Sequence, residues 1–165
     1  MLWDKGVAEL REASELLRDK WQIKLYFIWH GRYWYIVGVP DEYLNNWEDG
    51  IYVKWIGYEK EMINVYQDSH IVVHPSYREG MPKSLLEACS VGRPIVTTNA
   101  IGCKECVDEG INGFKVPIGS GEKLAKAIEK LLIDKELVKK MGANSRKKAE
   151  KEFNVECVIK RHLFV

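Results

Sequence analysis

Residues 71–98 of the chain read IVVHPSYREGMPKSLLEACSVGRPIVTT, and this stretch decides the fold. The apolar run at 71–74 ends at Pro75, which predicts a buried strand stopped by a proline. Pro82 opens a stretch with apolar residues at helical spacing, which predicts a helix with proline in its first turn. A second apolar run at 94–98 predicts another strand. Strand, helix and strand in this order are typical of a parallel sheet.

The same alternation extends over the rest of the chain. We expect helices at 5–21, 40–47, 59–67, 103–109, 121–133, 135–151 and 154–163, and further strands at 25–28, 51–55 and 113–116. Apolar strands that alternate with helices favour a sheet covered on both faces. The fold class is therefore α/β, a Rossmann-like doubly wound parallel sheet, with residues 1–165 as one domain. Such sheets bind ligands at the carboxyl ends of their strands.

Composition and charge exclude several classes of protein. The 165 residues are 46% hydrophobic and 30% charged, as in an ordinary globular domain. No apolar run reaches the roughly 20 residues of a membrane span, and the N-terminus does not resemble a signal peptide. Four cysteines indicate a reduced, cytoplasmic protein. The net charge is +1. Residues 120–165 hold 12 basic and 7 acidic side chains, whose signs alternate along the sequence. This alternation predicts solvent-exposed helix faces and no nucleic-acid partner.

The loop after the strand at 71–74 has the features of an anion site. Gly80 allows a ligand to approach the backbone closely, and Pro82 pre-sets the first helical turn without loss of a needed donor. The free N–H groups of that turn and the helix dipole favour a phosphate.

Two carboxylates, Glu79 and Glu87, bracket this anion site. One could accept sugar hydroxyls and the other ribose hydroxyls, as a nucleoside-diphosphate sugar requires. Two alternatives stay open: both side chains are solvated charges, or they are the acid and base of a glycosidase. A hydrolase of neutral sugars has no use for a phosphate site, which disfavours the second alternative.

This pattern resembles a known family. Glu79 and Glu87 stand in the run PSYREGMPKSLLEA, which is similar to the signature of the family 4 (group 1) retaining glycosyltransferases. The likeness continues in three further stretches and in the segment Trp3–Gly6; the stretches are GRPIVTT at 92–98, GCKE at 102–105 and NGFKVP at 112–117. The resemblance covers nearly the whole chain apart from residues 29–40.

The resemblance implies the C-terminal, donor-binding half of a GT-B fold. It assigns catalysis to Glu79, which would face the transferred sugar and support the retaining reaction. It assigns the ribose hydroxyls to Glu87 and the diphosphate to Lys5. The other implied donor contacts belong to the phosphate loop and the base loop: Gly80, Met81, Pro82, Gly57 and Tyr58. No metal or other cofactor is implied, because basic side chains and the helix dipole act at the departing diphosphate.

The chain departs from the family pattern in two places. The first strand, its phosphate-binding Arg and the acceptor domain would precede Met1, so we expect a truncated domain with unpaired strand edges. At residues 29–35, aromatic side chains stand where the family has a Gly-rich turn. We interpret that segment as frameshifted or decayed, and we have no physical account of it.

The sequence therefore predicts the donor-binding part of a glycosyltransferase of cell-envelope or capsular polysaccharide synthesis. The donor would be a UDP- or GDP-linked sugar, and the acceptor a saccharide or lipid-linked saccharide held by the missing domain. The expected location is the cytoplasm, with contact at the inner face of the membrane and self-association left open. An inactive remnant or a non-catalytic nucleotide-binding module is the alternative, and an epimerase or phosphorylase is a third.

Two other patterns are weak indications of a metal. Cys103 and Cys106 have ligand spacing but lack a second pair, so buried small residues are the favoured interpretation. His70 and His74 are interpreted as core or strand-end histidines.

Overall fold

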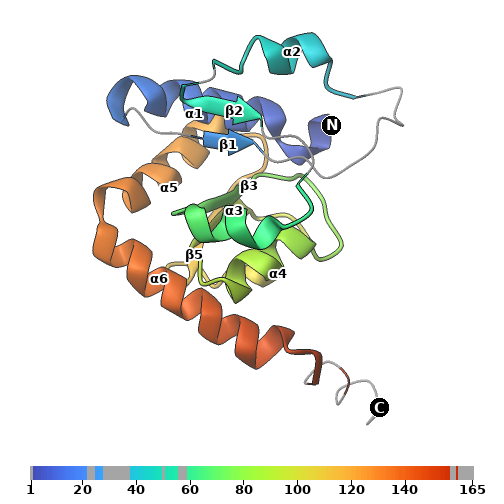
Figure 1. Cartoon of the computed structure of the whole chain (residues 1–165), viewed down its shortest axis with the longest axis vertical. Coiled ribbons are helices and arrows are strands. Elements are labelled where there is room, and N and C mark those ends of the chain that lie inside the picture. Colours follow the sequence, from blue (N-terminus) through green and yellow to red (C-terminus); the bar gives the residue numbers. More distant parts are fainter. Residues whose placement is uncertain are drawn as a thin grey trace.

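The computed structural model describes residues 2–21, 25–27, 38–49, 51–55, 59–156 and 159. Strands and helices alternate along them (Figure 1). The strands are β1 (Leu25–Phe27), β2 (Val53–Trp55), β3 (Val72–His74), β4 (Ile95–Thr98) and β5 (Gly113–Val116). The α-helices are α1 (Val7–Trp21), α2 (Asp41–Asn45), α3 (Met62–Asp68), α4 (Lys83–Ser90), α5 (Gly121–Ile133) and α6 (Lys135–Lys148). Shorter turns are the 3-10 helices η1 (Trp3–Lys5) and η2 (Lys104–Cys106) and the π-helical turn η3 (Ala149–Phe153).

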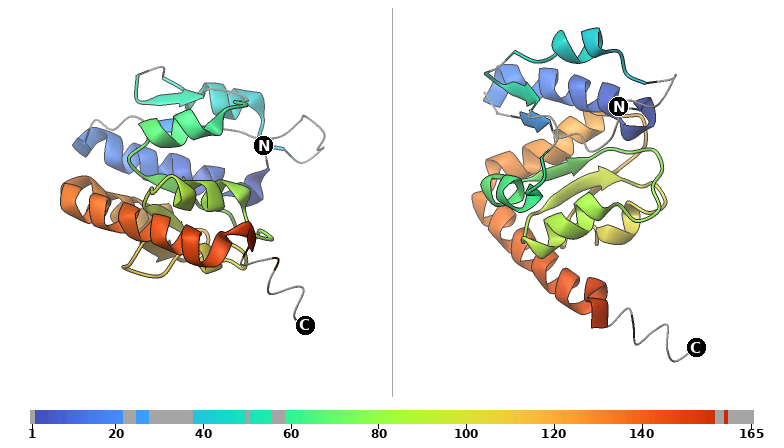
Figure 2. Two further views of the ribbon diagram at one scale, coloured as in Figure 1. Left: turned by 60° about the horizontal axis from the view of Figure 1, so that its bottom comes forward. Right: turned by 45° about the vertical axis from the view of Figure 1, so that its right-hand side comes forward.

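Two apolar layers enclose β4, whose four residues are all buried. Ile95 packs in a cluster with Leu85 of α4, whereas Val96 packs in a second cluster with Leu124 of α5. Successive side chains of a strand point to opposite faces of the sheet. Helix α4 therefore covers one face and α5 the other (Figure 2). Helix α1 lies along α5 and shares its cluster through Leu17.

The described strands form two parallel groups. β1 pairs with β2, and β3, β4 and β5 form a second sheet in that order. Among the described strands, β1 pairs only with β2 and β3 only with β4, so each keeps one unpaired edge. This matches the expected unpaired edges. All residues of β3 are half-buried, in contrast to those of β4. The predicted α/β fold class with parallel strands is confirmed.

The strand predicted at 51–55 begins two residues late. The carboxylate oxygen Oδ1 of Asp49 accepts hydrogen bonds from the N–H groups of Ile51, Tyr52 and Val53, at 2.7–3.0 Å. Local bonds of this kind compete with sheet pairing, because they occupy the backbone donors. Residues 51 and 52 therefore form a bend, and β2 starts at Val53.

Three predicted helix ends differ from the structure by three residues, and one of them is the start of α3, which was expected at residue 59 and lies at Met62. The helix expected at 103–109 is a single 3-10 turn, because the side chain of Asn112 takes the N–H of Asp108 and stops the helix there. The helix expected at 135–151 ends at Lys148 and passes into the π-helical turn. The helix expected at 154–163 falls mostly outside the described residues. No helix in the described part of the chain is long and apolar enough to cross a bilayer.

Candidate functional site

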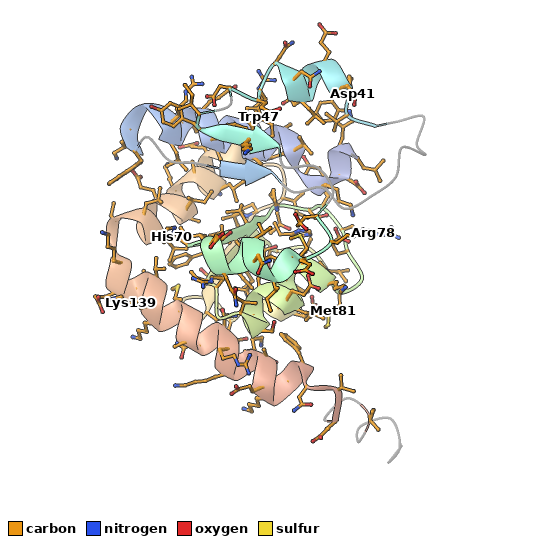
Figure 3. The ribbon with its side chains drawn as sticks, in the orientation of Figure 1. Asp41, Trp47, His70, Arg78, Met81 and Lys139 are labelled. Carbon is orange, nitrogen blue, oxygen red and sulfur yellow. The ribbon has the colours of Figure 1, made fainter. Side chains whose placement is uncertain are left out.

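The loop between β3 and α4 carries most of the residues for which the sequence predicts chemistry. β3 ends at His74. In the loop from there to α4, residues 77, 78, 80 and 81 are exposed, Glu79 is half-buried and Pro82 is buried. His70 precedes β3, and Arg78 and Met81 follow it. Figure 3 shows Arg78 and Met81 on the opposite side of this part of the molecule from His70. The loop thus lies at the carboxyl end of β3, where parallel sheets bind ligands.

Pro82 is the N-cap of α4 and not a residue of its first turn, which corrects the prediction. Its ψ of 119° is extended, and its carbonyl oxygen accepts hydrogen bonds from the N–H groups of Leu85 and Leu86. The helix therefore begins at Lys83, and the N–H groups of Lys83 and Ser84 have no acceptor within the helix. The anion site stays a prediction, and the helix start on which it depends lies one residue later than expected.

Lys5 and Glu79 meet at this loop although they are far apart in the sequence. The ammonium Nζ of Lys5 lies 2.7 Å from Oε1 of Glu79. Backbone contacts hold the Lys5 segment in place, since the carbonyl of Asp4 accepts hydrogen bonds from the N–H of Tyr77 and the hydroxyl of Ser76. The structure thus brings the predicted phosphate-binding lysine to the predicted catalytic carboxylate.

Two glycines allow the backbone segments around this ion pair to approach one another. Gly6 has a φ of 72°, and a Cβ there would lie 2.1 Å from the carbonyl oxygen of Pro75. Gly102 has a φ of 86°, and a Cβ there would lie 2.2 Å from the carbonyl oxygen of Gly80. Positive φ disfavours L residues, and such contacts are shorter than any real Cβ makes. Gly102 thus supports the loop that presents Glu79.

Glu79 is held as an anion. Nε2 of His74 lies 3.3 Å from the same Oε1 that Lys5 contacts, and the side chain of Glu79 is only 18% exposed. The hydrogen bond with His74 and, next, the contact with Lys5 outweigh the effect of burial and lower the pKa of Glu79 to about 2. A general acid of a glycosidase needs a raised pKa. The low pKa therefore does not suit Glu79 to the role of the acid in a glycosidase pair.

His74 is a site residue that the spacing of the histidines did not reveal. It lies at the strand end, as one of the two interpretations held, but there it faces Glu79 on one side and Ser84 of α4 on the other, with Nδ1 3.5 Å from the hydroxyl. Burial by itself would lower the pKa of His74, yet hydrogen bonds with Cys103 and Glu79 outweigh it and raise the pKa. The contacts of the ring therefore favour its protonated form.

Glu87 lies on α4 and faces α3. The hydroxyl of Tyr66 donates a hydrogen bond to its Oε2 at 3.3 Å, and Nζ of Lys83 lies 3.3 Å from its Oε1. Burial, and then the charge of Glu87, raise the pKa of Tyr66, so the hydroxyl stays protonated and remains a donor. Tyr66 positions the carboxylate, and no motif in the sequence pointed to it. The ribose contact of Glu87 stays a prediction.

The remaining predicted contacts fall into two groups. Gly80 and Met81 are exposed, and a Cβ on Gly80 would meet no atom within 4 Å. The space beside Gly80 is thus open, and the donor contacts of Gly80 and Met81 stay predictions. Gly57 and Tyr58 of the predicted base loop lie outside the described residues, as does the aromatic segment 29–35.

The cysteines of the described part are buried and form no disulfide: Cys89, Cys103 and Cys106. Burial raises the pKa of Cys89 to about 11 and that of Cys106 to about 12, so both are neutral thiols. The interpretation of Cys103 and Cys106 as buried small residues is confirmed. Within the described ranges, no group of three or more His, Cys, Asp or Glu side chains could hold a metal ion.

Comparison with known proteins decides the family. Residues 1–148 match the family described as glycosyl transferases group 1. The chain belongs to this family. The match includes the whole of the site, from the Lys5 segment to the loop of Gly102. The predicted glycosyltransferase resemblance is thereby confirmed at the level of the family.

Relatives of this group 1 glycosyltransferase chain are about two and a half times as long. An N,N'-diacetylbacillosaminyl-diphospho-undecaprenol alpha-1,3-N-acetylgalactosaminyltransferase of Campylobacter jejuni is 30% identical over 170 residues, 98% of this chain and 41% of the relative. The capsular polysaccharide biosynthesis glycosyltransferase CapM of Staphylococcus aureus is 29% identical over 157 residues, 94% of this chain and 40% of the relative. The chain thus spans about two-fifths of these relatives.

A solved structure shows the same fold. The crystal structure of Anabaena Alr3699/HepE in complex with UDP matches with a TM-score of 0.81 and 21% identity, over 96% of this chain and 44% of that one. The arrangement of strands and helices in this chain is therefore shared with that part of the solved structure.

Proposed function

We propose that the chain is the donor-binding part of a retaining glycosyltransferase, its C-terminal half, and that it binds a UDP- or GDP-linked sugar. The observation that carries this proposal is the meeting of Lys5 and Glu79 beside the start of α4. A cation, a set of free N–H groups and an ionised carboxylate then lie around one exposed loop. A sugar diphosphate needs the cation and the N–H groups at its phosphates, and it needs the carboxylate at its sugar.

In this proposal Lys5 and the first turn of α4 stabilise the diphosphate. The leaving diphosphate gains negative charge as the bond to the sugar breaks, and fixed positive groups lower the energy of that state. Lys5 supplies a full charge, and the N–H groups of Lys83 and Ser84 supply the helix dipole. This assignment needs no metal ion, so we expect donor binding to be unchanged by a chelator.

Glu79 acts on the sugar side. The transition state of glycosyl transfer has the positive charge of an oxocarbenium ion. With a pKa of about 2, Glu79 carries a full negative charge at neutral pH and can stabilise that state or accept sugar hydroxyls. Glu87, positioned by Tyr66, would accept the ribose hydroxyls of the donor.

The acceptor is the part of the proposal that depends most on the relatives. The name of the Campylobacter jejuni relative includes a diphospho-undecaprenol substrate, and that of CapM includes capsular polysaccharide. We propose a lipid-linked or saccharide acceptor, reached at the inner face of the membrane and held by a further domain. Orientation of two substrates supplies much of the rate, so the present residues alone should bind the donor but transfer sugar poorly. A nucleotide-binding module without turnover is the alternative.

A calorimetric titration with UDP, GDP and their sugar conjugates tests the proposal. We expect saturable binding with a preference for one base, and binding about tenfold weaker in Glu87→Ala, because one charged hydrogen-bonding group is lost. Glu136→Ala is the matched control, since Glu136 also pairs with a lysine on its own helix, Lys139 at 2.8 Å. Absence of binding by the folded wild type, or equal loss in both variants, would contradict the donor site.

A further inference from the structure

One oxygen of Glu79 contacts two nitrogen atoms from different parts of the chain, the ammonium of Lys5 and the imidazole of His74. Oε1 accepts from Nζ of Lys5 at 2.7 Å and lies 3.3 Å from Nε2 of His74. Lys5 belongs to η1, and His74 ends β3. Lys5 and His74 therefore interact with the same carboxylate oxygen. If one of them moves away, the electrostatic interaction of the other with Glu79 changes.

The proposed function requires Lys5 to leave this arrangement. If Lys5 turns to the diphosphate, the carboxylate of Glu79 loses its shortest contact. Lys5 can move, because its side chain is 37% exposed and its stem is flexible, whereas Glu79 is 18% exposed and comparatively fixed. A carboxylate that is largely withdrawn from water needs a replacement partner.

We propose that His74 is the positioning residue that takes over Glu79, becoming protonated when the donor diphosphate draws Lys5 away. This inference rests on the proposed function. The proton comes from solvent and is bound by Nδ1, while Nε2–H keeps its hydrogen bond to Glu79. Donor binding is thus accompanied by uptake of about one proton at a pH where the free imidazole is neutral.

Ser84 is suited to both protonation states of the ring. Its hydroxyl lies 3.5 Å from Nδ1 of His74. A hydroxyl can donate to the neutral ring and accept from the protonated one. The other groups that face the ring are Glu79, the thiol of Cys103 and, beyond the carboxylate, Lys5. The contacts with Glu79 and Cys103 raise the pKa of His74 despite its burial, so its surroundings favour the protonated ring.

The first test needs no ligand. NMR titration of the histidine ring signals should give a higher pKa for His74 in Lys5→Met than in the wild type, because Glu79 then interacts with the ring alone. Lys139→Met, which breaks a remote pair, should leave this pKa unchanged. An unchanged pKa in Lys5→Met would overturn the shared charge, whether or not the chain binds nucleotides.

The second test measures protons during donor binding. Calorimetry with UDP-N-acetylglucosamine and GDP-mannose in buffers of different ionisation enthalpy gives the number of protons taken up; these diphosphates are esterified at both ends and do not titrate near neutral pH. We expect uptake of about one proton in the wild type and in His70→Gln, whose histidine is exposed and precedes β3. We expect little uptake in His74→Gln, which keeps a hydrogen-bond donor.

The possible outcomes separate the two proposals. Binding with equal uptake in wild type and His74→Gln overturns the role of His74 and leaves the donor site intact. Absence of binding to any nucleotide sugar overturns the proposed function and the coupled uptake together, while the ligand-free titration still decides whether Lys5 and His74 share the charge of Glu79.

Discussion

Gly102→Ala is expected to destabilise the fold by about 3 kcal/mol or more and to abolish donor binding. The new Cβ would lie 2.2 Å from the carbonyl oxygen of Gly80 and 2.4 Å from that of Glu79. Both contacts are to backbone, which cannot rotate away, so the loop that presents Glu79 must move. Thermal unfolding should shift downward by roughly 6–12 °C for a chain of this size.

Gly110→Ala is the matched control for this substitution. Gly110 has a φ of 73°, close to the 86° of Gly102, but a Cβ there would meet no atom within 4 Å. Its cost is therefore the conformational one alone, about 1 kcal/mol. Calorimetric or circular-dichroism melting of both variants separates the steric cost from the conformational one. Equal losses would contradict the close approach of the two loops.

Lys5→Met is expected to weaken binding of a nucleoside-diphosphate sugar by about a hundredfold. A charge-assisted contact with the diphosphate contributes about 1.5–3 kcal/mol. Lys5→Met removes a full positive charge from the diphosphate, so this loss exceeds that expected for Glu87→Ala.

Lys139→Met serves as the control for Lys5→Met, because Lys139 also pairs with a carboxylate but lies on the distant helix α6. Figure 3 shows Lys139 on the opposite side of the molecule from Arg78 and Met81. Titration of both variants with the preferred nucleotide sugar makes the comparison. Wild-type affinity in Lys5→Met would remove Lys5 from the site and would leave its contact with Glu79 purely structural.

The fold followed from the sequence where local signals were strong. Helix α5 has the predicted limits, and α6 starts where predicted, because Ser120 and Asp134 cap them with side-chain hydrogen bonds to the N–H groups of Lys123 and Leu137. The predicted start of β2 and the predicted end of the helix at η2 were wrong. In both cases a single side chain, Asp49 or Asn112, accepts a hydrogen bond from a backbone N–H group nearby. Such bonds depend on geometry that periodicity does not describe.

The site was predictable only in part. Pro82, Gly80 and the neighbouring carboxylates indicated a phosphate loop. The family resemblance, and not spacing, assigned Lys5 and Glu79 to the same donor, and their direct contact was not predicted. His74 and Tyr66 were missed as site residues because their contacts depend on which side chains face one another across β3, α3 and α4. The division of the strands into two groups agrees with the unpaired edges that the family resemblance implied.

The most direct test of the central claim is an NMR titration of the isotope-labelled chain with the UDP- and GDP-linked sugars. We predict that the largest shift changes of the backbone amides fall on Lys5, Gly80, Met81 and the first turn of α4, and that they saturate. Saturable changes centred on another surface, or none at all in a folded chain, would contradict a donor site between β3 and α4.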